Sequence, residues 1–506
     1  MTKIGAFGRM TAAVWVLVRN DALLPRELDD AYLPSVAFIA RTLRLFAGPG
    51  ARQGRPGERL ARALEGTGPV AIKLGQVLST RGDFFGREFA EDLSRLKDRL
   101  PAFPTKVARA EVEKALGRKI ESLYAEFGEP LAAASLAQAH EAKLLDGRKV
   151  AVKVLRPGIE RRVADDAESL TLAARLIDRW IPPARRLEPI AFAETVIRAV
   201  SLELDLRLEA AGADELREVM AKDGYMAAPP IVWEGVGKRV LTMEWAHGWP
   251  LSDPGALTQP GLDRQAMADN LIRAFLSQAL DHGVFHADLH EGNLFAAAPA
   301  SLTAVDFGII GRIGPAERRY LAEILWGFLN RDYEAVARTH FDAGYVPAHH
   351  SVEAFAQALR AVGEAVFGRP ASEVPMSRVL LQLFEITALY EMRLRPELVL
   401  LQKTMMTVEG VARRILPDHN IWSAADPVVR RWIARELSPT ARIKRFADEA
   451  MAALRNIARL AESLPATGVT TTVEARETRS GGSALLWFAA GAVVAGAAFL
   501  AALYLR

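Results

Sequence analysis

The stretch His286-Ala287-Asp288-Leu289-His290-Glu291-Gly292-Asn293 decides the fold of this chain, together with Asp306-Phe307-Gly308, which begins thirteen residues after Asn293. Asp288 and Asn293 stand five residues apart on a predicted loop between a helix and a strand. The apolar run 302–305 predicts the strand that returns to Asp306. One side chain of this hairpin can steer a nucleophile, and two can hold Mg²⁺ beside a triphosphate. The spacing therefore predicts a phosphoryl-transfer site.

A lysine in an apolar strand supplies a second half of this site. The run Lys149–Leu155 (KVAVKVL) predicts a β-branched strand, entered through the hairpin turn Asp146-Gly147. Lys153 has apolar neighbours on both sides, so its charge needs a carboxylate, a phosphate or both. The alternative is an edge-strand lysine that reaches solvent. The downstream motifs favour the functional interpretation.

Acidic residues on a predicted helix over 191–221 provide candidate partners for Lys153. Asp205 and Glu209 are four residues apart and should share a helix face. Glu203 precedes Glu209 by six residues, a rotation of roughly 120° onto another face. We expect Glu209 to pair with Lys153 and Glu203 with another lysine. The alternative for Asp205 is a solvated position paired with an arginine.

An alanine-rich segment stands where a glycine-rich phosphate loop is expected. Ala132-Ala133-Ala134-Ser135 precedes the Lys153 strand by one predicted strand. Methyl groups restrict the backbone, so this loop should be stiffer than a glycine loop. The alternative is a helix start capped by Ser135, but the position in the strand order favours a loop.

This alanine-rich segment, the Glu203-x-Asp205 pair and the motif Lys73-Leu74-Gly75-Gln76 together resemble the UbiB family of atypical kinases, the aarF-domain proteins of ubiquinone biosynthesis. The resemblance covers about residues 65–315. It implies an α+β, bilobal protein-kinase-like fold with a helical N-terminal extension and a C-terminal transmembrane helix. In that family the Lys-x-Gly-Gln segment covers the surface where a protein substrate would dock.

The resemblance also implies roles for single residues. Lys153, Glu209 and Asp288 would be catalytic, with Lys153 on the α- and β-phosphates of ATP, while Asn293 and Asp306 would hold Mg²⁺. Lys73 and Gln76 would face the nucleotide pocket, with Lys73 near Glu203, and Glu203 and Asp205 would share this regulatory or substrate pocket. The nucleotide-binding residues would be Ala132, Ala133, Ala134, Ser135, Lys153 and the hinge residues Met243 (the gatekeeper), Glu244 and Trp245.

Departures from ordinary protein kinases bear on the substrate. Ala287 stands where ordinary protein kinases have the arginine that binds an activation-loop phosphate. The chain is predicted to enter a helix soon after Gly308, which leaves no room for a long activation segment. Binding and hydrolysis of ATP are therefore expected without protein phosphorylation. A zinc site at His286, Asp288 and His290 is an alternative, but Gly292-Asn293 argues against the continuous strand that it needs.

The amino-acid composition excludes several classes of function. The chain has 506 residues, a net charge of +3 with dispersed basic residues, and no cysteine. These features argue against nucleic-acid binding, and the lack of cysteine excludes disulfides and thiolate chemistry. A chain of this length can hold two lobes and extensions.

The C-terminal segment Ala484–Leu505 has 22 uncharged residues, about 33 Å as a helix. Trp487 and Tyr504 lie near its ends, as in membrane-interface belts, and a buried core helix is the alternative. Arg476 and Arg479 precede the segment, which favours a single span of the bacterial inner membrane with the kinase-like domain in the cytoplasm. Residues 4–20 predict a short amphipathic helix on the protein or membrane surface.

We therefore expect an Mg²⁺-dependent ATPase that supports ubiquinone biosynthesis by acting on or presenting membrane isoprenoid quinone precursors. The alternatives are a small-molecule or lipid kinase and a nucleotide-gated scaffold for other biosynthetic proteins, and a homodimer is left open. The predicted division of the chain is an N-terminal region (1–57), the extension (58–125), the N-lobe (126–245), the C-lobe (246–464), a flexible linker (465–483) and the membrane span (484–505).

Overall fold

The computed structural model describes residues 3–27, 34–79, 87–94, 96, 101–180, 185, 188–366, 386, 389–392 and 396–436. Within this part of the chain, no helix has both the length and the hydropathy needed to cross a bilayer. The predicted linker (465–483) and the predicted membrane span (484–505) lie outside the described residues, as does the end of the predicted C-lobe.

An antiparallel sheet of four strands, in the order β1-β2-β3-β4, forms the N-terminal lobe. The strands are β1 (Tyr124–Ala133), β2 (Ala137–Leu144), β3 (Lys149–Leu155) and β4 (Val240–Glu244). Val150, Val152 and Val154 of β3 are fully buried in a core that includes Val112 of helix α7 (Thr105–Leu116). Because side chains alternate along a strand, Lys153 lies on the opposite face of the sheet.

Three helices connect β3 to β4, namely α8 (Ile159–Trp180), α9 (Pro189–Glu203) and α10 (Leu206–Asp223). The prediction of one helix over 191–221 is wrong, because the helix is interrupted after Glu203. Asp205 has an extended backbone (φ −122°, ψ 91°), and its side chain accepts a hydrogen bond from the backbone N–H of Arg207. Aspartate is a strong helix N-cap, and this cap begins α10. Asp205 and Glu209 therefore do not share a helix face.

The C-terminal lobe begins with α11 (Arg264–Ser277), whose apolar face lies in the largest hydrophobic core. A π-helical segment (Gln278–His282) follows and leads into β6. Two small sheets flank the helix, with strand orders β5-β7-β8 and β6-β9. Their strands are β5 (Trp249–Pro250), β6 (Val284–His286), β7 (Leu294–Ala297), β8 (Ser301–Ala304) and β9 (Ile310–Arg312).

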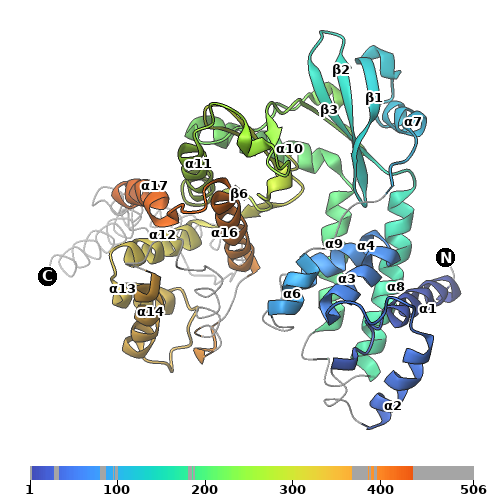
Figure 1. Cartoon of the computed structure of the whole chain (residues 1–506), viewed down its shortest axis with the longest axis horizontal. Helices are drawn as coiled ribbons and strands as arrows, with labels where there is room; N and C mark the ends of the chain where they lie inside the picture. The colour runs from blue at the N-terminus through green and yellow to red at the C-terminus, as the bar shows by residue number, and fades with distance from the viewer. Residues whose placement is uncertain are drawn as a thin grey trace, which may run out of the picture. The chain divides into compact units, whose positions relative to one another are not determined.

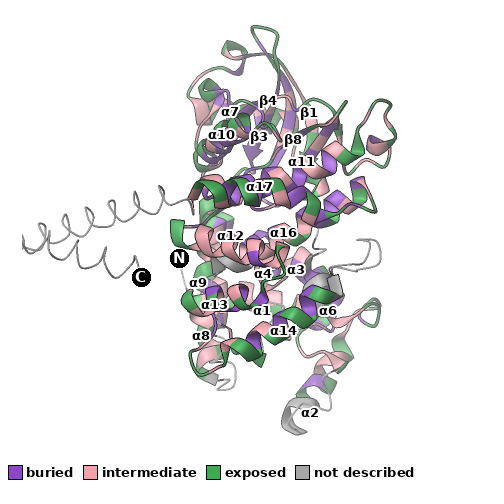
Figure 2. Cartoon of the chain, turned by 90° about the vertical axis from the view of Figure 1, so that its left-hand side faces the viewer, coloured by how far each residue is buried: buried purple, intermediate pink, exposed green. Residues whose placement is uncertain are grey.

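Helices make up the described remainder of the C-terminal lobe. They are α12 (Pro315–Leu329), α13 (Tyr333–Asp342), α14 (Val352–Val366), α16 (Pro396–Ile415) and α17 (Ile421–Glu436). The helices α16 and α17 pack against α11, and α13 packs against α14. Buried and exposed residues alternate along α14 and α17, the pattern of amphipathic helices (Figure 2).

The N-terminal helices are α1 (Lys3–Arg19), α2 (Pro34–Leu43), α3 (Pro56–Thr67), α4 (Pro69–Ser79) and α6 (Arg87–Ser94). The helix predicted over 4–20 is α1, which packs against α8, while α4 packs against α9 (Figure 1). A Cβ atom at Gly75 of α4 would collide with the side chains of Leu96 and Leu64. Glycine at this position therefore lets α4 pack closely against its neighbours.

Candidate active site

Lys153 lies at the centre of a charged cluster that joins the two lobes. Its Nζ donates hydrogen bonds to Oε1 and Oε2 of Glu209, at 2.7 and 3.0 Å, and to Oδ1 of Asp306 at 3.0 Å. Glu209 comes from the first turn of α10, and Asp306 follows β8. The Glu209 side chain is 8% exposed, so its charge has little access to water. The predicted pairing of Lys153 with Glu209 is present in the structure.

Burial and neighbouring charges set the protonation of this cluster. Burial raises the pKa of Glu209 to about 7, and the negative charge of Asp306 adds to this effect while Lys153 opposes it. The positive charge of Lys153 holds the pKa of Asp306 well below its usual range. Burial by itself would lower the pKa of Lys153, but the charges of Asp306 and Glu209 outweigh it and raise that pKa. Lys153 and Asp306 are therefore ionised at neutral pH, whereas Glu209 exchanges its proton near pH 7.

The loop between β6 and β7 carries Asp288 and Asn293. The side-chain amide of Asn293 donates to the backbone carbonyl of Asp288 at 3.1 Å, which fixes the two residues relative to each other. His286 Nδ1 accepts a hydrogen bond from the Asp288 N–H at 3.1 Å, and its Nε2 lies 3.2 Å from the carbonyl oxygen of Val305. Both ring nitrogens are therefore engaged, and the zinc interpretation of His286 with Asp288 and His290 is wrong. Burial also lowers the pKa of His286, so the ring is neutral.

A backbone hydrogen bond and a ring contact connect this loop to the segment that carries Asp306. The Val305 N–H donates to the carbonyl oxygen of Asn293 at 2.9 Å. Asp306 has φ 60°, a left-handed conformation that is uncommon for a residue with a side chain. The buried ring of Phe307 packs against His286, with ring centroids 5.0 Å apart. These neighbours hold Asp306 in its unusual backbone conformation, as strained residues in functional sites require.

The donor set of the loop fits Mg²⁺. Asp288 and Asp306 offer carboxylate oxygens, and Asn293 offers its amide oxygen because the amide nitrogen is already bonded. Oxygen donors of this kind are the ligands that Mg²⁺ prefers. The nearby ammonium of Lys153 shows that Asp306 already accepts a cationic partner.

The N-terminal extension contributes a second ion pair. Lys73 of α4 is hydrogen-bonded to Glu203 at the end of α9, and these side chains are 13% and 25% exposed. Burial raises the pKa of Glu203, the charge of Lys73 opposes this, and Lys153 and Asp306 also act on it. The predicted Lys73–Glu203 pair thus forms next to the Lys153 cluster. Gln76 lies one turn after Lys73 on α4.

Asp205 does not join these residues. Its carboxylate binds the guanidinium of Arg207, at 2.9 Å to Nε, in addition to capping α10. The hydrogen bonds to Arg207 lower the pKa of Asp205. The prediction that Asp205 belongs to the pocket of Lys73 and Glu203 is therefore not supported by its contacts, and the arginine-paired alternative describes it.

The alanine-rich segment forms the turn between β1 and β2. Ala132 and Ala133 end β1, and the Ala134 N–H donates to the carbonyl of Ala137 at 2.8 Å. Arg156 donates from Nε to the carbonyl of Ala134 at 2.9 Å, and Ser135 is buried. The segment is a strand-to-strand loop, so the helix-start alternative is wrong.

The predicted hinge lies at the end of β4. Met243 is buried and faces Ala151 of β3 in the strand register. The Glu244 N–H donates to the carbonyl of Pro230 at 2.9 Å, and the Trp245 N–H donates to the carbonyl of Lys149 at 3.1 Å. The backbone N–H groups of Glu244 and Trp245 therefore already donate hydrogen bonds within the protein. An adenine bound at this hinge would need other backbone groups.

Sequence reasoning missed the support that α16 gives to the loop. The Thr404 hydroxyl lies 3.1 Å from the carbonyl oxygen of Ala287, 117 residues away, and 2.8 Å from that of Leu400 in its own helix. Arg414 forms an ion pair with Glu291. From the other side, Gln278 Oε1 accepts a hydrogen bond from the His286 N–H at 3.1 Å. No local pattern marks Thr404, because a threonine inside a helix carries no signal of a partner so distant.

Comparison with known proteins finds sequence and fold matches for this chain. The family model of the ABC1 atypical kinase-like domain matches residues 95–340, and that of the UbiB helical domain matches residues 359–420. A protein of Marinobacter nauticus named probable protein kinase UbiB is 38% identical over 444 residues, which cover 86% of this chain and 80% of the relative. A protein of Cellvibrio japonicus with the same name is 37% identical, with coverage of 87% and 80%. The solved complex of Rv3197 with erythromycin from Mycobacterium tuberculosis has a TM-score of 0.52 and 21% identity over 72% of this chain and 93% of that one, which shows a shared fold.

Proposed function

Because this chain belongs to the UbiB family of ABC1 atypical kinase-like proteins, we propose that it is an Mg²⁺-dependent, ATP-using phosphoryl-transfer enzyme. The observation that carries the proposal is the position of Lys153 between Glu209 and Asp306, beside the loop of Asp288 and Asn293. Such an arrangement of one ammonium, carboxylates and an amide is what a metal-bound triphosphate requires.

Each residue of the site has a physical role in this proposal. Glu209 holds the Lys153 ammonium in place, and Lys153 neutralises phosphate charge where burial strengthens the interaction. Asp288 orients the attacking hydroxyl or water and accepts its proton. Asn293 and Asp306 would hold Mg²⁺, which supplies positive charge to the phosphate oxygens when it is bound.

The acceptor is proposed to be water or a small molecule rather than a peptide. Only six residues separate Gly308 from Pro315, the first residue of α12, so a long activation segment is absent from this fully described stretch. The Lys73–Glu203 pair holds α4 beside the site, where a peptide would otherwise dock. Both features favour hydrolysis of ATP.

The biological role proposed here follows from the family. ATP turnover would support ubiquinone biosynthesis by acting on or presenting membrane isoprenoid quinone precursors to other biosynthetic proteins. The uncharged segment Ala484–Leu505 would anchor the chain in the bacterial inner membrane, with the kinase-like domain in the cytoplasm.

A lipid or small-molecule kinase is the second candidate, because the short segment after Asp306 removes the peptide platform without removing the site. The two candidates differ in the fate of the γ-phosphate. Label recovered in a lipid extract would favour the kinase, and label recovered as free phosphate would favour the ATPase.

The central test uses the full-length chain in detergent or lipid bilayers. We expect Asp306→Asn to lose Mg²⁺-dependent ATP turnover, because it removes the carboxylate that faces Lys153 and would hold Mg²⁺. The control is Asp426→Asn, which breaks a surface pair with Arg430 on α17. Turnover that is unchanged in Asp306→Asn would remove Asp306 from the site.

A further inference from the structure

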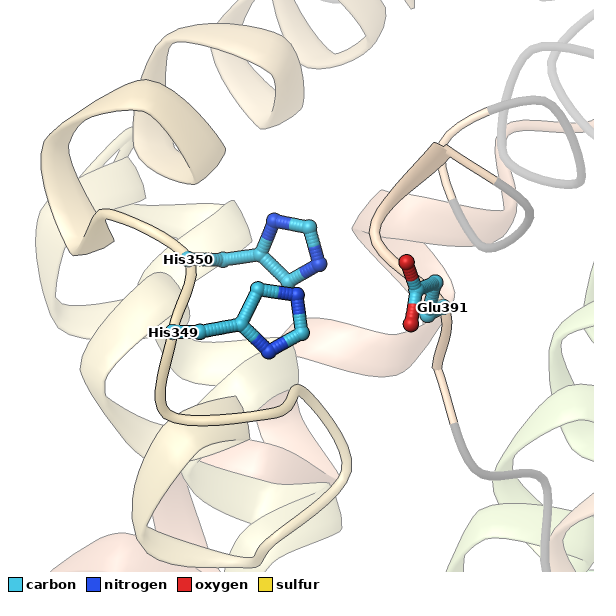
Figure 3. A group of neighbouring side chains, drawn as sticks. All are labelled: His349, His350 and Glu391. Atoms are coloured by element: carbon cyan, nitrogen blue, oxygen red, sulfur yellow. The ribbon is translucent and has the colours of Figure 1, made fainter.

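A second group of metal-ligating side chains lies apart from the Lys153 cluster. His349 and His350 stand in the loop between α13 and α14, and Glu391 lies in a turn that precedes α16. Their candidate donor atoms all lie within 4.8 Å of one another, and no other group of three such residues was found among those that the structure describes. Both imidazole rings lie on the side of the loop that faces the Glu391 carboxylate (Figure 3).

One ring nitrogen in this group lacks a partner. The Nε2 atom of His350 is buried and forms no hydrogen bond with any described residue. A buried polar atom without a partner destabilises the folded chain, so a water or an ion is expected beside it. The side chain of Glu391 is exposed. Among the described residues, a ring nitrogen without a hydrogen-bond partner and an exposed carboxylate therefore lie at one place.

Packing positions the ligands before any ion binds. The His350 ring contacts His349 and Tyr390, with centroid distances of 4.1 and 5.2 Å. Tyr390 is 9% exposed and directly precedes Glu391, so the core holds the turn that carries the carboxylate. The tilted ring contact likewise positions His350, while His349 stays exposed.

We propose that His349, His350 and Glu391 bind a divalent transition-metal ion of the zinc class, with water as the fourth ligand. Two imidazole nitrogens and one carboxylate oxygen are a common donor set for Zn²⁺. Tetrahedral ligands at 2.0–2.1 Å from the ion lie about 3.4 Å apart, so the donor atoms need to approach one another by about 1.4 Å at most. Rotation of exposed side chains such as His349 and Glu391 provides a movement of this size.

The bound ion would link two parts of the helical lobe. One is the loop between α13 and α14, and the other is the turn that leads into α16. Thr404 of α16 contacts the carbonyl of Ala287. The bound ion would therefore stabilise the helix that supports the Asp288 loop. This site is distinct from the Mg²⁺ site, since nitrogen ligands favour transition metals and the Asp288 loop offers oxygens.

The test is a titration of the full-length chain, purified with a histidine-free tag and stripped with a chelator. Co²⁺ is added in excess Mg²⁺, and the visible absorption of tetrahedral Co²⁺ and the heat of Zn²⁺ binding are recorded. We expect one ion per chain, and at least ~10-fold weaker binding in His349→Ala and in Glu391→Gln, because each removes a ligand.

The chain has nine histidines, and two control variants separate this site from the seven that lie outside it. His247→Ala removes an exposed histidine elsewhere, and His290→Ala removes the one nearest Asp288. Both should bind Co²⁺ as the wild type does. The proposal is overturned if neither Co²⁺ nor Zn²⁺ binds to the wild type, or if Mg²⁺ displaces the bound ion. It is also overturned if His290→Ala abolishes Co²⁺ binding, or if His349→Ala and Glu391→Gln bind Co²⁺ as the wild type does. The readout does not depend on ATP turnover.

Discussion

Replacing Glu209 by Gln should stabilise the folded chain at neutral pH while it lowers ATP turnover. Two carboxylates, the buried Glu209 and the half-exposed Asp306, share the ammonium of Lys153. Gln is similar in size to Glu and can still accept a hydrogen bond from Lys153, but it carries no charge. The substitution therefore removes a buried negative charge, and with it the anion that fixes Lys153 for phosphate binding.

The pKa of Glu209 gives the size and sign of this effect. Burial raises it from 4.5 to about 7, and at about 1.36 kcal/mol for each tenfold change in proton affinity the upper bound is about 3.4 kcal/mol. Below pH 4.5 the carboxyl is protonated in the folded and the unfolded chain alike. Between 4.5 and 7 the folded chain retains a proton that the unfolded chain has released, so the wild type loses stability as pH rises. The variant does not titrate here and keeps its stability.

The assay is the thermal unfolding of the full-length chain from about pH 5 to 7.5. One kcal/mol corresponds to roughly 2–4 °C in a domain of 150–250 residues. We expect the Tm of Glu209→Gln minus that of the wild type to grow by at least ~3 °C over this range. Glu218→Gln, at an exposed position of the same helix, is the control and should give a constant difference. A difference for Glu209→Gln that is flat or falls with pH would refute the reasoning.

Three further perturbations test other contacts. Glu203→Gln should loosen α4 from α9, since it removes the charge that pairs with the mostly buried Lys73, and hydrogen exchange of α4 amides should speed up while that of α11 stays constant. Ala133→Gly should change nucleotide affinity or turnover if the methyl group restrains the loop, and equal values for both proteins in a nucleotide titration would dismiss that role. Thr404→Val removes the hydroxyl that the carbonyls of Ala287 and Leu400 share, at a cost of up to about 3 kcal/mol. We expect a lower Tm and a lower kcat, and Thr407→Val, whose hydroxyl bonds only within α16, is the comparison.

Local patterns predicted the elements that carry the site. The run of β-branched residues predicted β3 with its observed bounds, and Asp146-Gly147 marked its hairpin. The motif residues correctly indicated a loop for Asp288 and Asn293 and a strand before Asp306, but the element that precedes the loop is strand β6 and not the predicted helix. The predicted helix over 191–221 was wrong because apolar periodicity continues through the break, while the cap formed by Asp205 depends on its own backbone conformation.

The sequence by itself determined which chemical groups are present and that a charge within an apolar strand needs a partner, which led to Lys153 and Glu209. The tertiary structure decided which distant groups meet: it brought Asp306 to Lys153, paired Asp205 with Arg207, used the backbone donors of the hinge, and placed Thr404 beneath the loop. It also brought Glu391 to His349 and His350. The physical reason is that the energy of a charge pair or a hydrogen bond depends on distance and burial, and both are set by the packing of segments far apart in the chain.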